Sequence, residues 1–290
     1  MTPPRNSNAA RDIAHVLHPY TDHRAHLKNG PVVIARGEGV RVWDDQGKEY
    51  VEAAHAQMQR LPFYHAFAAK SHEPMIDLSE MLIERSPCAM SKVFYANSGS
   101  EANDTAVKMI WYVNNATGKP RKKKLISRIK GYHGITCVAG SLTGLPTNHR
   151  MFDLPVSDRF IHVATPHHYH GARPGETEEA FSARLAAELE ETILREDPET
   201  VAAFFAEPVM GAGGVMVPPA GYFEKIQAVL RKYDVLFVAD EVICGFGRTG
   251  NYWGSQTYSI TPDIITCAKA LSASFLPISA IIINERIFQG

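Results

Sequence analysis

Two patterns of apolar residues alternate along this chain, one typical of buried strands and one typical of helices. Near-continuous apolar runs occupy residues 201–206, 235–239 and 278–283. Runs of this length and composition are typical of strands buried on both faces of a parallel sheet. Shorter strand patterns lie at 92–96, 125–127 and 263–266.

Helical periodicity fills the intervals between these runs. It is clearest at 178–195, where apolar residues recur every four positions at Phe181, Leu185, Leu189 and Ile193. Similar patterns lie at 75–84, at about 101–114 and at 222–233. Such alternation predicts an α/β fold with a mainly parallel sheet and helices on both faces.

Composition adds few constraints. The 290 residues suffice for one large domain or two smaller ones, and a net charge of −1 gives no basic field for nucleic acid. The basic run 121–124 is interpreted as a solvated loop. No segment reaches the roughly 18 apolar residues of a membrane span, and residues 1–5 lead into no secretory signal. Four cysteines without a close pair fit reduced thiols, so a cytoplasmic location is expected.

Asp240 and Lys269 form the most informative pair. Asp240 ends an apolar run, so it would lie at the carboxyl end of a buried strand, where open α/β sheets bind ligands. Lys269 follows the next predicted strand and offers an amine nucleophile. An acid for a ring nitrogen and a lysine for an aldehyde match the needs of pyridoxal phosphate (PLP).

Three further segments carry candidate chemistry, each with an ordinary alternative. Residues 97–103 follow a strand and open a helix, so they are either a phosphate site or a plain N-cap. Residues 131–134 place Tyr132 where it could stack on a ring, or form a turn with an incidental aromatic. Glu207 follows another strand, either beside a ligand or as a surface loop acid.

Histidine is abundant, and 167–170 contains three histidines around one tyrosine. Pro166 and Gly171 bracket this tract as a loop, and no neighbouring acid or cysteine completes a ligand set. No metal site is therefore expected. The glycines of 245–250 are interpreted as a loop rather than a dinucleotide site, because they do not join a strand directly to a helix.

The order of these motifs resembles that of class III PLP-dependent aminotransferases, in the ω-aminotransferase branch. The similarity rests on Asn-Ser-Gly-Ser-Glu-Ala-Asn at 97–103, Gly-Tyr-His-Gly at 131–134, Glu207-Pro208, Asp240-Glu241-Val242 and Lys269. It implies a fold type I large domain with a seven-stranded sheet. Residues 1–60 would be an N-terminal segment with a hairpin at 40–51, and 61–290 the PLP-binding domain.

The resemblance also implies a role for each site residue. Lys269 would bond the cofactor aldehyde and move protons, and Asp240 would pair with the pyridinium nitrogen. The remaining cofactor-binding positions would hold the phosphate, cover the two faces of the ring, or support these contacts: Ser98, Gly99 and Ser100 at the phosphate, Tyr132 and Val242 on the ring, Glu207 and His133 beside them.

Two departures from the family pattern are expected. Residues 48–54 join segments that relatives keep apart, which indicates an internal deletion. The sequence stops soon after the strand that follows Lys269, so most of the small domain is expected to be missing, with its carboxylate-binding arginine and a threonine that reaches the partner subunit.

The leading functional hypothesis is PLP-dependent transamination of an amine or ω-amino acid, with a keto acid such as pyruvate as acceptor, in a family of homodimers. Two alternatives stay open. The chain could be a catalytically impaired PLP-binding remnant, or it could catalyse another PLP reaction on the same fold, such as an aminomutase reaction.

Overall fold

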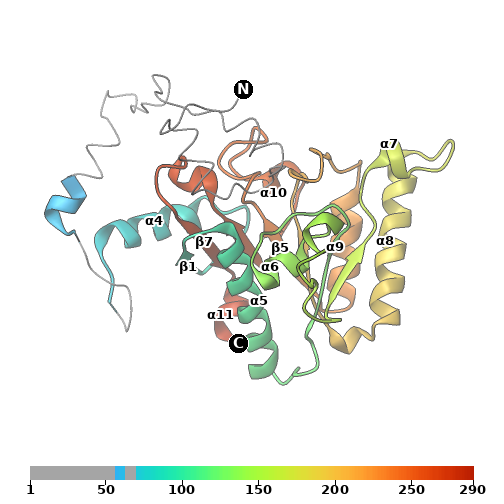
Figure 1. Cartoon of the computed structure of the whole chain (residues 1–290), viewed down its shortest axis with the longest axis horizontal. Coiled ribbons are helices and arrows are strands. Elements are labelled where there is room, and N and C mark those ends of the chain that lie inside the picture. The colour runs from blue at the N-terminus through green and yellow to red at the C-terminus, as the bar shows by residue number, and fades with distance from the viewer. Residues whose placement is uncertain (1–55, 63–69) are drawn as a thin grey trace, which may run out of the picture. The chain divides into compact units, whose positions relative to one another are not determined.

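The computed structural model describes residues 56–62 and 70–290 (Figure 1). The chain divides into two compact units, Met1–His72 and Glu73–Gly290. Only a short helix at 56–60 is described in the first unit. The hairpin predicted at 40–51 and the join predicted at 48–54 lie outside the described residues.

Within the described residues, seven strands form one sheet in the order β1-β7-β6-β5-β4-β2-β3. All neighbours are parallel except those of β7, which runs antiparallel to both β1 and β6. The predicted seven-stranded, mainly parallel sheet is therefore confirmed. The strands are β1 (Lys92–Ala96), β2 (Lys124–Arg128), β3 (Phe160–Val163), β4 (Val201–Ala206), β5 (Leu236–Asp240), β6 (Ile264–Cys267) and β7 (Ser279–Ile283).

The helices fill the connections between strands. The longer ones are α4 (Glu73–Glu84), α5 (Gly99–Ala116), α8 (Glu178–Arg195) and α9 (Tyr222–Lys232). The shorter ones are α6 (Cys137–Leu142), α7 (His168–Gly171), α10 (Gly254–Thr257) and α11 (Glu285–Gln289), with 3₁₀ turns η1 (Pro146–Asn148), η2 (Pro198–Thr200) and η3 (Lys269–Ser272).

The sheet is packed on both faces, as the apolar strand runs require. Helices α5, α6 and α11 cover one face, where Phe205 of β4 belongs to the same buried cluster as Ile110 of α5. On the opposite face, α8 and α9 cover β2, β4 and β5, and Phe204 points to that side. Leu82 of α4 packs with Trp253 over β6 and β7. Figure 1 shows α5 and the α8–α9 pair on either side of the strands.

Sequence periodicity located the long elements and the short strands β1, β2 and β6, but it missed β3 and α6. All four apolar residues predicted for the face of α8 are buried. In contrast, β3 is an edge strand of four residues without a continuous apolar run, and the six residues of α6 span fewer than two helical turns. Within the helix predicted at 75–84, Ile76 is exposed. The tract 167–170, predicted as a loop, contains a single helical turn, α7.

The basic run 121–124 is not a solvated loop throughout. Lys122 is only 3% exposed. Its Nζ donates to three backbone carbonyl oxygens, of Val201 at 3.1 Å, Tyr233 at 3.0 Å and Asp234 at 2.9 Å. Burial lowers the pKa of this ammonium, and the three acceptors offset the cost of removing it from water. One lysine of the basic run is therefore a buried structural cation, which links the segment before β2 to the start of β4 and the end of α9.

The sheet brings distant residues to one edge. Asp240 ends β5, Glu207 follows β4, and residues 131–134 follow β2. Because these strands are parallel, their carboxyl ends lie on the same side of the sheet. Lys269 after β6 and residues 97–100 after β1 reach this side too, since β1 and β6 are both antiparallel to β7. Among the described helices, none is both long enough and apolar enough to cross a membrane.

We predict that Lys122→Met destabilises the folded chain by about 2 kcal/mol, because three carbonyls lose a charged donor. Urea unfolding measures the difference. Arg121→Met is the matched control, since Arg121 pairs with Asp197 at an exposed site, where a loss below about 1 kcal/mol is expected. Equal losses in the two variants would contradict a structural role for the buried ammonium.

Candidate functional site

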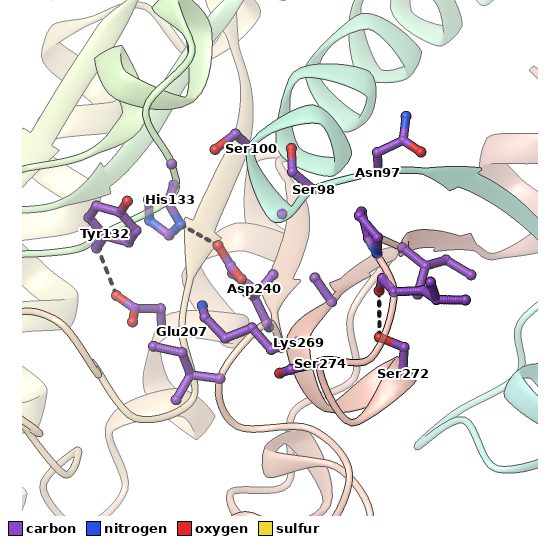
Figure 2. Close-up of a pocket in the computed structure, with 18 of the residues that line it drawn as sticks. Asn97, Ser98, Ser100, Tyr132, His133, Glu207, Asp240, Lys269, Ser272 and Ser274 are labelled. Atoms are coloured by element: carbon purple, nitrogen blue, oxygen red, sulfur yellow. Dashed lines mark hydrogen bonds and ion pairs between the residues drawn. The ribbon is translucent and has the colours of Figure 1, made fainter. Parts of the chain in front are cut away.

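A cavity of about 550 Å³ opens at the carboxyl edge of the sheet (Figure 2). All nine site residues proposed from the sequence line it, although they are spread over five segments of the chain: Ser98, Gly99, Ser100, Tyr132, His133, Glu207, Asp240, Val242 and Lys269. The fold therefore assembles the whole predicted set around one space.

The Asp240 carboxylate is held by three hydrogen-bond donors. It is 3% exposed. Oδ2 accepts from Asn103 Nδ2 at 2.9 Å and is 2.8 Å from His133 Nδ1, while Oδ1 accepts from the backbone N–H of Val242 at 3.1 Å. Burying a carboxylate is costly unless its oxygens accept hydrogen bonds, and these three donors offset most of that cost. The acid is thus fixed in direction at the end of β5.

His133 borders the cavity beside Asp240. Its side chain is fully buried, and its Nδ1 bears the proton when it donates to an ionised Asp240. Its backbone N–H donates to Thr143 Oγ1 at 2.9 Å. His133 thus contacts the Asp240 carboxylate directly, and its predicted role beside the cofactor stays a prediction.

Asn103 was quoted in the sequence motif, but its role was missed. It is fully buried, and its Nδ2 donates both to Asp240 and to the backbone oxygen of His133 at 2.7 Å. The signal was present in the sequence. Asn103 stands three, four and seven positions before Ala106, Val107 and Ile110, so it is an amide on the apolar face of α5.

A turn at the start of α5 forms another wall of the cavity. Ser98 caps the helix, since its Oγ accepts from the Glu101 N–H at 3.2 Å. The first N–H groups of a helix have no acceptor within it, and they attract anions. A Cβ at Gly99 would lie 3.0 Å from Val242 Cγ2, a tight contact, so the absence of a side chain at Gly99 favours the close approach of these segments. This wall is suited to an anionic group.

Glu207 is a buried acid, which excludes the surface-loop alternative. It is 3% exposed, and burial raises the pKa of its carboxyl group. Oε1 accepts from the Tyr132 N–H at 3.0 Å, and Oε2 accepts from the Gly211 N–H at 2.8 Å. Its own backbone oxygen accepts from the buried guanidinium of Arg128 at 2.6 Å. Glu207 therefore ties the Tyr132 segment to the end of β4.

Lys269 lies directly after β6, at the start of η3. Its backbone has a φ of 47°, in the left-handed region that a non-glycine residue rarely adopts. Figure 2 shows its side chain extending toward the part of the cavity that Asp240 and Glu207 line. Lys269 is exposed to solvent. Within the described residues, its amine has no hydrogen bond or ion pair.

The histidine tract lies apart from this set and does not line the cavity. The Nε2 of His168 is 2.8 Å from the backbone oxygen of Glu176, and His167 stacks on His170 with ring centroids 4.6 Å apart. In residues 56–62 and 70–290, no three His, Cys, Asp or Glu side chains are arranged to hold a metal ion.

The donor set fits a particular kind of molecule. Asp240 offers an anionic acceptor for a protonated ring nitrogen, and Lys269 offers a primary amine for a carbonyl carbon. The turn at Ser98–Ser100 offers N–H groups and hydroxyls for an anion, and Tyr132 and Val242 offer surfaces for the faces of a ring. Such an arrangement can hold a phosphorylated pyridine aldehyde.

Comparison with known proteins agrees with this arrangement. The family model "Aminotransferase class-III" matches residues 51–290. Gamma aminobutyrate transaminase 1 of Solanum lycopersicum is 49% identical, over 94% of this chain and 56% of that protein. Vanillin aminotransferase of Capsicum annuum is 50% identical, over 89% of this chain and 60% of its own length.

Solved structures share the fold. The omega transaminase of Pseudomonas jessenii, solved in complex with PMP, superposes with a TM-score of 0.93 at 57% identity, over 98% of this chain and 67% of that one. The present chain thus spans between half and two thirds of the length of the curated relatives named above. The match extends over the sheet, the cavity and both cavity-lining acids. The chain belongs to the class-III aminotransferase family.

Proposed function

We propose that this chain binds PLP in the cavity and takes part in transamination between an amine or ω-amino acid and a keto acid, with pyruvate as the acceptor. The single observation that carries the proposal is the buried Asp240 carboxylate, with Lys269 lining the same cavity. PLP supplies an electron sink that stabilises negative charge on the substrate carbon.

Asp240 acts by orientation and charge. Because three donors hold its oxygens, the carboxylate cannot turn away from the cavity without breaking a hydrogen bond. A fixed anion favours a protonated ring nitrogen beside it, and protonation of that nitrogen strengthens electron withdrawal by the ring.

Lys269 would hold the cofactor and move protons at the substrate. Its Nζ is the primary amine that would bond the cofactor aldehyde. As a free amine, the same Nζ would take a proton from the substrate and return it, as a general base and acid. Lys269 is exposed and has no ion pair within the part of the chain that the structure describes, so its amine is free to take both roles.

The remaining residues fix the position of the ring. Tyr132 and Val242 would cover its two faces, and the Glu207 contact with the Tyr132 N–H holds the tyrosine segment in place. Ser98, Gly99 and Ser100 would bind the phosphate at the start of α5. The cavity thus orients the cofactor at its nitrogen, its faces and its anionic tail.

A homodimer and a cytoplasmic location belong to the same proposal. Ile135, Met151 and Phe152 are 70% to 90% exposed, and contact with a second copy would remove such side chains from water. Ile135 lies next to the cavity, since its N–H donates to Ser100 Oγ at 3.1 Å.

Reduction of the PLP-loaded chain with borohydride tests the proposal directly. We expect an absorption band at about 400 nm, typical of a lysine Schiff base, which borohydride abolishes. Mass spectrometry of the reduced protein should find the added group on Lys269. Lys269→Ala should lack both the band and the adduct. An adduct on a different lysine, or no band at all, would refute PLP binding at this site.

The same preparation separates the enzyme from a binding remnant. Addition of an amine donor should bleach the band and release the matching carbonyl compound, which is measured by chromatography. A stable band with every donor tried would favour the remnant.

Asp240→Asn should retain cofactor but slow the half-reaction roughly hundredfold, because a neutral hydrogen bond replaces a charged one. Stopped-flow absorbance with a saturating amine donor measures the rate. A rate within about twofold of the unmodified chain would contradict the proposed role of the carboxylate.

Ser100→Ala should weaken PLP binding about tenfold through loss of one phosphate contact. Equilibrium dialysis measures the dissociation constant. Pyridoxal without phosphate is the control ligand, and its affinity should not change. Equal weakening for both ligands would instead indicate damage to the Ile135 contact or to the turn.

A further inference from the structure

Asp240 presents two unequal oxygens. A carboxylate accepts about two hydrogen bonds at each oxygen. Asn103 and His133 occupy Oδ2, whereas Oδ1 accepts only from the Val242 N–H among the described residues. One acceptor position therefore stays open, and it belongs to Oδ1.

The orientation of the Asn103 amide follows from its neighbours. The backbone oxygen of His133 can only accept, so the atom 2.7 Å from it must be the amide nitrogen. The second N–H of that nitrogen then points to Asp240 Oδ2. The amide oxygen faces Thr266 Oγ1 at 2.9 Å, so the Thr266 hydroxyl must donate to it.

Thr266 reaches this amide because of the sheet register. Asp240 of β5 and Thr266 of β6 are paired residues on neighbouring parallel strands, so their side chains project from the same face. That face is covered by α5, which carries Asn103. Thr266 and Asn103 are both fully buried, so water does not compete for these hydrogen bonds.

We propose that Thr266 and Asn103 are positioning residues that keep Asp240 Oδ2 engaged and leave Oδ1 as the oxygen that meets the cofactor ring nitrogen. This inference rests on the proposed PLP binding. Thr266 fixes the amide, the amide fixes Oδ2, and the open acceptor position is left on Oδ1 of a residue that lines the cavity. Neither residue lines the cavity, so both act through Asp240.

A double-mutant cycle on PLP affinity tests this chain of contacts. Thr266→Val keeps the side-chain shape and removes the hydroxyl, and we expect about a tenfold higher dissociation constant for PLP. Thr266→Ser keeps the hydroxyl and is the matched control, with an affinity within about twofold of the unmodified chain. Thr266→Ala can replace Thr266→Val in the cycle if the valine variant folds poorly.

The decisive comparison is made in the Asp240→Ala background. There, Thr266→Val should cause no further loss of affinity, because the carboxylate through which it acts is gone. The same tenfold loss in both backgrounds, or no loss in either, would overturn the positioning role. If the unmodified chain itself does not bind PLP, the proposed function fails, which is a separate result.

Discussion

A carboxylate that is buried at the end of a strand must find hydrogen-bond donors inside the protein, and much of this site follows from that need. Asp240 draws donors from three segments: Asn103 from α5, His133 from the loop after β2, and the Val242 N–H from its own chain. These hydrogen bonds hold the three segments together at the carboxyl edge of the sheet. Because the buried carboxylate needs these donors, it also brings the walls of the cavity together.

Glu207 repeats the same arrangement at the neighbouring strand. Its two carboxylate oxygens accept from the Tyr132 and Gly211 backbones, and the Arg128 guanidinium holds its carbonyl. Glu241 is a third buried acid, and it accepts from the Ser255 N–H and hydroxyl at 2.6 Å and from the Gly254 N–H at 3.0 Å. Lys269, by contrast, is exposed and unpaired within the described residues. The acids are fixed while the amine is left free, which suits a site where one group must move.

Long, regular elements could be predicted because their periods repeat. The helix at 178–195 and the strand at 201–206 have the predicted bounds. The cavity residues could be predicted because acids, glycines and a lysine stand at strand ends. What escaped prediction were contacts made across the fold. The burial of Lys122 depends on carbonyls of β4 and the end of α9, and the Asn103–Thr266 contact depends on the register of β5 and β6. In both cases the interacting residues lie far apart in the sequence.

The ring nitrogen of bound PLP tests the central claim most directly. We predict that ¹⁵N NMR of the chain loaded with ring-¹⁵N-labelled PLP, at neutral pH, shows the chemical shift of a protonated pyridinium, because the fixed Asp240 anion stabilises the proton. A shift typical of a neutral pyridine would contradict the account, since it would mean that the buried carboxylate does not meet the ring nitrogen.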